Sequence, residues 1–210
     1  MESWNLLIME SDTFLTIASE STGVYKEKGS KFLAFVYPVS NEEEAREKVD
    51  FLHKKFHDAR HHCYAWRIGL NGEHCRVNDD GEPAHSAGKP ILGQLVAHGV
   101  TNVLAVVVRY FGGTLLGVGG LMQAYKLATI DALAHAKTVT DIITETWQLT
   151  FDYPYMNQVL KIVKEMNIDC YTQDFNIHCI MMIKVRKSRT VQIEKRFNTV
   201  ESLIIEKKLP

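Results

Sequence analysis

The sequence lacks the apolar run of about 18 residues that a membrane-spanning helix requires. It also lacks an excess of charge of either sign, because 24 lysines and arginines stand against 25 aspartates and glutamates. A polybasic nucleic-acid binder is therefore not expected, although a local basic face remains open. The first residues, Met1–Trp4, carry no basic segment of the kind that begins a secretory signal peptide, so we expect a cytoplasmic protein without a membrane partner.

Cysteine is scarce, and no two cysteines have the spacing of a CxxC pair. Histidines are more frequent, and His53 and His57 are spaced as ligands on one helix face would be. The sequence patterns of zinc hydrolases, zinc deaminases, serine hydrolases and Walker phosphate loops are nevertheless absent. We therefore predict no metal site, no cofactor and no catalytic residue. In a cytoplasmic chain we expect the four cysteines to be reduced: Cys63, Cys75, Cys170 and Cys179.

Hydrophobic patterning predicts an α+β fold. Three glutamates followed by apolar residues at helical spacing predict a helix over Glu42–His57. The continuous apolar run Val103–Val108 is typical of a central strand buried on both faces, and a glycine-rich loop and a helix over residues 119–136 follow it. Gly23–Lys28 and residues 78–87 are rich in turn-forming residues, so we predict a turn and a loop there.

The chain divides near Lys137, where the pattern of elements changes. Asp141–Phe151 is predicted to form one strand, and the order strand–helix–strand–strand–helix–strand fills the last 70 residues or so. This order is the ferredoxin-like arrangement. Because 210 residues suffice for two small domains, we predict domains over residues 1–137 and 138–210.

The segment that follows the apolar strand has the composition of an anion site. Its glycines let the backbone approach a ligand closely, and the helix that follows directs N–H groups and a dipole toward an anion. The arginine that begins the segment can hold a phosphate through two N–H groups, and the aromatic residues beside it can stack on a base or belong to the core. A purely structural crossover is the alternative. The residues predicted to bind phosphate or nucleic acid are Arg109, Tyr110, Phe111, Gly112, Gly113, Gly117, Gly119, Gly120 and, from a preceding loop, Lys89.

Three acidic residues, Asp79, Asp80 and Glu82, lie within four positions in the predicted loop over residues 78–87. Such carboxylates can hold Mg²⁺ through water, act as an acid–base pair, or bond to backbone N–H groups of the loop. A helix that begins near residues 86–88 would place its N–H groups close to them. We therefore predict that the three acids order the loop or hold a cation.

Taken together, several segments resemble the IMPACT/YigZ family in its bacterial two-domain form. Each motif alone is weak, but they occur in the order and spacing of the family and cover about residues 15–135. One departure is His85-Ser86, where many bacterial members have Gly-Thr. The segments that carry the resemblance are His61–Trp66, Asp79–Pro83, Ala87–Leu92, Val106–Gly113, Leu116–Leu121 and Ala124-Tyr125.

The resemblance implies an N-terminal βαβ domain that resembles domain IV of elongation factor G. It also implies a C-terminal domain like domain V of that factor and a translation-linked role associated with RNA or the ribosome. The family has no established enzymatic activity. Eukaryotic members restrain the general-control kinase pathway with an additional RWD domain, and we do not expect that activity here.

The sequence thus predicts a cytoplasmic RNA- or ribosome-binding protein that modulates translation. Two other classes stay open. One is an enzyme that acts on a phosphorylated or peptide substrate with the acidic loop and Arg109. The other is a protein-interaction module that docks a translation partner without contacting RNA. A deep pocket that joins Asp79, Glu82 and Arg109 would favour the enzyme, and an exposed basic face would favour RNA.

Overall fold

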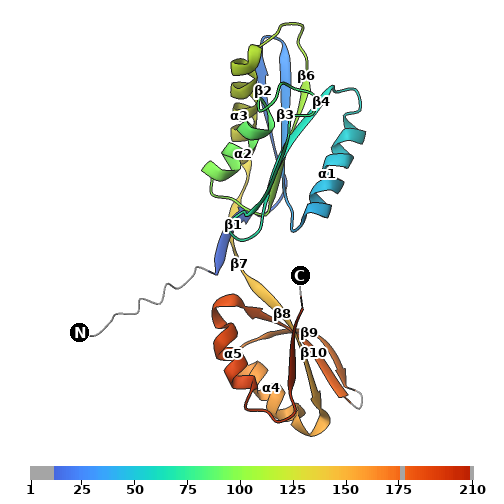
Figure 1. Cartoon of the computed structure of the whole chain (residues 1–210), viewed down its shortest axis with the longest axis vertical. Helices are drawn as coiled ribbons and strands as arrows, with labels where there is room; N and C mark the ends of the chain where they lie inside the picture. The colour runs from blue at the N-terminus through green and yellow to red at the C-terminus, as the bar shows by residue number, and fades with distance from the viewer. Residues whose placement is uncertain (1–11, 176–177, 209–210) are drawn as a thin grey trace, which may run out of the picture. The chain divides into compact units, whose positions relative to one another are not determined.

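A computed structural model describes residues 12–175 and 178–208. The expectation about Met1–Trp4 lies outside the described residues. Contacts divide the chain into an N-terminal unit, Phe14–Asp141, and a C-terminal unit that contains residues 142–208 together with Asp12 and Thr13 (Figure 1). The sequence predicts the boundary after Lys137. The structure places it after Asp141, because β7 (Thr138–Ile142) pairs with β1 (Thr13–Ile17).

The N-terminal unit contains a five-stranded sheet in which every neighbouring pair is antiparallel. Strands β3 and β4 lie on either side of β6 and are therefore parallel to each other. The helix α1 (Glu42–Lys55) connects them, so β3–α1–β4 is a βαβ crossover with β6 inserted between its strands. In spatial order the strands are β2 (Ser21–Glu27), β3 (Ser30–Pro38), β6 (Val103–Tyr110), β4 (His61–Ile68) and β5 (His74–Asn78).

Strand β6 is the centre of the unit, as its apolar run predicted. Val103, Ala105 and Val107 pack with α2 (Gly88–Ala97) and α3 (Gly117–His135), while the residues between them pack on the side of α1. Figure 1 shows α1 on one face of the sheet and the other two helices on the opposite face. Because both faces of β6 are covered, its sequence is continuously apolar rather than alternating.

The prediction of a turn over Gly23–Lys28 is wrong, since most of this segment belongs to β2. A Cβ atom on Gly23 would lie 2.2 Å from the backbone nitrogen of Ala132 in α3, so this glycine allows the helix to approach the strand. The turn itself is at Lys28 and Gly29, which have φ values of 45° and 79°.

The C-terminal unit has, among its described residues, a four-stranded sheet with the order β11–β8–β10–β9. This order and the two β–α–β segments form the ferredoxin-like arrangement that the sequence predicted. The predicted strand over Asp141–Phe151 is instead divided between β7 and β8, because Ile143 leaves the ladder to bond with Asp12 and Lys187. The elements are β8 (Thr144–Asp152), α4 (Met156–Glu165), β9 (Asp169–Phe175), β10 (His178–Arg186), α5 (Thr190–Phe197) and β11 (Ile204–Lys208).

No helix in the described ranges combines the length and the apolar character that crossing a membrane demands.

The substitution Gly23→Ala is expected to destabilise the protein, because the new methyl group would overlap the backbone of α3. Forced overpacking of this kind costs about 1–3 kcal/mol, which urea unfolding measures. Gly93→Ala in α2 is the matched control. Nothing lies within 4 Å of its added Cβ, so it should be neutral or stabilising. Equal stability of the two variants would contradict the packing role of Gly23.

Candidate functional site

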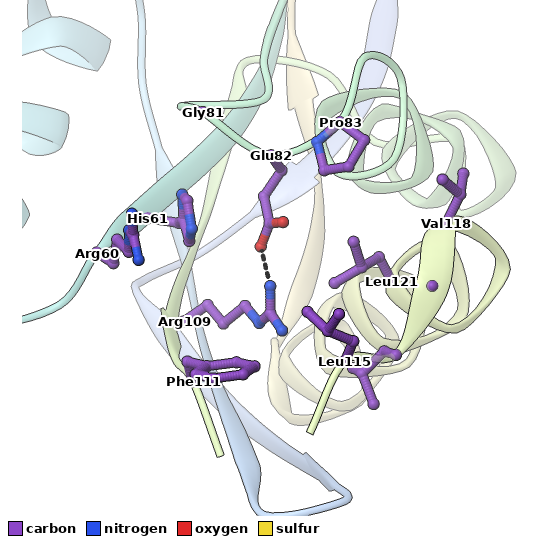
Figure 2. A pocket seen from close by; sticks show the side chains of 12 residues that line it. Arg60, His61, Gly81, Glu82, Pro83, Arg109, Phe111, Leu115, Val118 and Leu121 are labelled. Carbon is purple, nitrogen blue, oxygen red and sulfur yellow. Dashed lines mark hydrogen bonds and ion pairs between the residues drawn. The ribbon is translucent and has the colours of Figure 1, made fainter. Parts of the chain in front are cut away.

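A cavity of about 480 Å³ opens where β6 leads into α3. Figure 2 shows its two sides, with Arg60 and His61 from the start of β4 on one and Leu115, Val118 and Leu121 on the other. The walls are mainly apolar, with two arginines, one histidine and one glutamate among them. The lining residues are Arg60, His61, Gly81, Glu82, Pro83, Arg109, Phe111, Leu115, Leu116, Gly117, Val118 and Leu121.

A buried ion pair lies against this cavity. The Nη1 atom of Arg109 is 2.6 Å from Oε1 of Glu82, and the two side chains are only 7% and 4% exposed. The Tyr125 hydroxyl donates to the same carboxylate oxygen at 2.8 Å. The guanidinium also lies 5.4 Å and 5.6 Å from the ring centroids of Phe32 and Phe111. Arg109 therefore anchors the acidic loop to β6, and its contact with a phosphate stays a prediction.

The buried polar network continues behind the ion pair. The Cys63 thiol donates to the Asp79 carbonyl at 3.0 Å and lies 3.3 Å from the Tyr125 hydroxyl. Burial raises the pKa of Cys63 and the pKa of Tyr125 far above their usual values. A protonated, buried thiol is a poor nucleophile, which argues against thiol chemistry at Cys63. Cys63, Cys75 and Cys179 form no disulfide, and Cys75 is exposed.

Asp79 bonds to the backbone at the start of α2. Its Oδ1 accepts N–H groups of Ala87 and Gly88 at 3.0 and 2.8 Å, and its Oδ2 accepts the N–H of His85 at 2.8 Å. Burial acts to raise the pKa of Asp79, but these backbone donors outweigh it and hold the pKa below its usual range. The N-cap residue Ala87 makes no side-chain cap, so a residue far upstream caps this helix.

Asp80 fixes the other side of the loop. Its Oδ2 accepts the N–H of His62 at 2.6 Å, and its carbonyl oxygen lies 2.7 Å from Nδ1 of His61. The residue adopts a φ of 40°, which the bond from its N–H to Oδ1 of Asn78 supports. Of the three predicted acids, only Glu82 lines the cavity with Arg109. The pocket that would join Asp79, Glu82 and Arg109 is therefore not formed.

The structure separates the other predicted residues into groups. Phe111 and Gly117 line the cavity, while Lys89 and Gly119 line a second hollow between the starts of α2 and α3. Gly113 and Gly120 lie in the same glycine-rich segment without lining either hollow. Tyr110 donates to Oδ1 of Asp58 at 2.8 Å and packs on the side of α1.

Gly112 allows its loop to approach the turn at Gly29 closely. Its Cβ would lie 1.9 Å from the carbonyl carbon of Gly29, and its N–H donates to Oγ of Ser30. Gly113 and Gly117 instead need left-handed backbone, at φ values of 85° and 71°. These three glycines therefore have structural reasons that do not require a ligand.

Sequence reasoning missed several residues of the cavity. Arg60 and His61 were not assigned to it, although the pairing of His61 with Arg109 across β4 and β6 brings them there. Leu115 is 83% exposed and Val118 is 52% exposed. Apolar residues within a glycine-rich segment are the signal that sequence reasoning overlooked.

Comparison with known proteins identifies the class to which this fold and site belong. The family model described as "Impact N-terminal domain" matches residues 28–133, which is half of the chain. All residues that line the cavity fall within this range. The chain therefore belongs to the IMPACT family, which confirms the resemblance of the motifs.

A bacterial member of the family is similar to this chain over more than nine-tenths of its length. "IMPACT family member YigZ" of Escherichia coli (strain K12) is 30% identical over 198 residues, 93% of this chain and 92% of the relative. A solved structure described as "Crystal structure of an hypothetical protein" is 30% identical, with a TM-score of 0.73, and covers 92% of this chain and 96% of that one. "Protein IMPACT homolog" of Saccharomyces cerevisiae is 38% identical over 96 residues, 43% of this chain and 36% of the relative.

Asp79→Ala is expected to lower the free energy of unfolding by about 1–2 kcal/mol at pH 7, because the start of α2 loses its cap. The folded pKa of Asp79 lies below its unfolded value of about 3.9. The stabilisation is thus present above about pH 4 and is lost as the pH falls through the folded pKa. Urea unfolding should therefore show a smaller difference in stability between wild type and variant at pH 3 than at pH 7. Asp50→Ala, at an exposed site on α1, is the control.

Arg109→Met is expected to lower the free energy of unfolding by about 3–5 kcal/mol, because it leaves the Glu82 carboxylate buried without its countercharge. The double variant Arg109→Met/Glu82→Gln removes that charge and keeps an acceptor for Tyr125. It should therefore be more stable than the single variant. If the double variant were the less stable of the two, the ion pair would not be the source of the loss.

Proposed function

We propose that this protein acts in the cytoplasm, binds single-stranded RNA of the ribosome, and thereby modulates translation. The family resemblance implies a translation-linked role. The observation that carries the choice of RNA is an apolar cavity bordered by an exposed aromatic ring, an arginine and a helix N-terminus. Sequence-tolerant binders of single strands combine these elements, since bases stack on the ring and phosphates meet the positive groups.

Phe111 is the base-stacking residue of this proposal. Its side chain is 50% exposed at the rim of the cavity, and the guanidinium of Arg109 lies 5.6 Å from its ring centroid. The ion pair with Glu82 holds that guanidinium in place, so the ring has a fixed support. A base that stacks on such a ring contributes about 1–3 kcal/mol.

The phosphate groups would meet Arg60 and the first turn of α3. Arg60 is exposed and lines the cavity. Helix α3 has no acidic residue in its first turn, and no side chain caps its N–H groups. These groups and the helix dipole favour an anion, and Gly117 and Gly119 leave the backbone exposed.

Further positive charge lies at the same end of the sheet. Lys26 pairs with Lys31, and Lys31 pairs with Tyr110, so the two lysines continue across the strands from the end of β6. With Lys28 at the turn, all three are exposed. Within the described part of the chain, these lysines and Arg60 form no ion pair. Such unpaired charge attracts a polyanion.

Docking of a protein partner is the second candidate. Leu115, Val118 and Met122 form an exposed apolar group on the glycine-rich loop and α3, with exposed fractions of 83%, 52% and 45%. An apolar surface of this kind is typical of protein contacts. Binding through it would depend little on salt, whereas binding through phosphates weakens as salt rises.

The test is binding of the full chain to fluorescently labelled single-stranded RNA and to ribosomes, at low and moderate salt. Phe111→Ala is expected to weaken RNA binding roughly five- to a hundredfold through the loss of stacking. The matched control is Phe51→Ala, because Phe51 lies on α1 and is equally exposed, at 51%. Equal affinities of the two variants would overturn the proposed site.

Arg60→Gln is expected to reduce the slope of log affinity against log salt by about 0.7, the value for one phosphate contact on a single strand. Arg46→Gln on α1 should leave the slope unchanged, because Arg46 is paired with Glu42 and does not line the cavity. Ribosome binding that is independent of salt and lost in Leu115→Ser would instead favour the protein partner.

A further inference from the structure

Three potential metal ligands meet at the end of α1, outside the cavity. His53 comes from the last turn of α1, His62 from β4 and Asp80 from the acidic loop. One ligand atom from each side chain lies within 4.8 Å of the other two. The rings of His53 and His62 have their centroids 4.0 Å apart, and Nδ1 of His62 is 3.8 Å from Oδ2 of Asp80.

A second observation points to a ligand here. The His62 side chain is 3% exposed, and its Nε2 atom is buried without a hydrogen-bond partner among the described residues. The carbonyl of Phe56 bonds to the same ring. A neutral imidazole that donates from one nitrogen keeps a lone pair on the other, and this is the form in which histidine binds a metal.

From this geometry we infer that His53, His62 and Asp80 bind a divalent transition-metal ion, with Zn²⁺ as the expected ion and water as its fourth ligand. Two imidazoles and one carboxylate form a mixed nitrogen–oxygen set that suits Zn²⁺, whereas Mg²⁺ prefers oxygen ligands alone. The sequence-based prediction of no metal site considers the histidines as zinc ligands without an acidic residue, and the only cation it considers for Asp80 is Mg²⁺.

The geometry requires a small adjustment on binding. A tetrahedral ion with bonds of about 2.1 Å holds its ligand atoms roughly 3.4 Å apart, so the three atoms must close by up to roughly 1.4 Å. His53 is exposed, and its ring already lies against that of the buried His62. Asp80 is 34% exposed, which leaves a path for the ion. The negative end of the α1 dipole also favours a cation at this place.

The bound ion would join α1, β4 and the acidic loop. Asp80 precedes Gly81 and Glu82, which line the cavity, and the Asp80 carbonyl contacts His61, which also lines it. The ion would therefore stabilise the loop on one side of the cavity. The site itself does not depend on RNA binding.

Isothermal titration calorimetry of the chelator-treated full chain with ZnCl₂ tests the site. We expect one equivalent to bind and thermal unfolding to shift to a higher temperature, because the ion binds only the folded site. His53→Gln and Asp80→Asn should each weaken the affinity at least tenfold. Asp80→Asn retains an oxygen acceptor for the N–H of His62, so its fold is preserved. His135→Gln, at the exposed end of α3, is the matched control and should bind as wild type does.

Absorption spectra with Co²⁺ in place of Zn²⁺ identify the ligands independently. The intense visible bands of tetrahedral Co²⁺ without a thiolate band are the expected result. A thiolate-to-metal band would assign the ion to Cys75, the exposed cysteine, and would overturn the inference. Binding that persists unchanged in His53→Gln, or no binding by the folded wild type at millimolar Zn²⁺, would overturn it as well.

Discussion

The buried ion pair between Arg109 and Glu82 holds the candidate site together. Arg109 belongs to β6, Glu82 to the acidic loop, and Tyr125 of α3 donates to the same carboxylate. Three segments that are distant in sequence therefore meet at one oxygen atom. A buried charge must find its partners in place, so the packing of α3 on the sheet and the position of the loop depend on one another. The support of Phe111 by the guanidinium follows from the same contact.

Local pattern was sufficient for most of the fold. The apolar run of β6 predicted its central position, and the helical spacing after Glu42 predicted α1 to within two residues of its end. The order of elements predicted the ferredoxin-like arrangement of the C-terminal unit. Gly23 was misassigned because the reason for that glycine is Ala132 in α3, a contact that no local pattern contains.

The sequence predicted which segments form the candidate site, but it did not predict which side chains contact one another there. The glycine-rich loop and the acidic loop were both identified from composition. The partner of Arg109 was not, since Glu82 reaches it only once the sheet and the loop are in register. The contact of His62 with Asp80 could not be predicted either. It forms only when the acidic loop lies against β4. The backbone bonds of Asp79 were foreseeable, because a helix start near residues 86–88 was expected to place its N–H groups close to the acidic residues of the same loop.

The contact between Gly29 and Gly112 fixes the position of one loop relative to another beside the cavity. Because a Cβ atom on Gly112 would overlap the backbone of Gly29, the turn that carries Lys28 and the loop that carries Phe111 touch main chain to main chain. Neither can shift without the other, so the spacing between that charge and that ring is set before any ligand arrives. A preorganised surface of this kind loses little conformational entropy when a ligand binds.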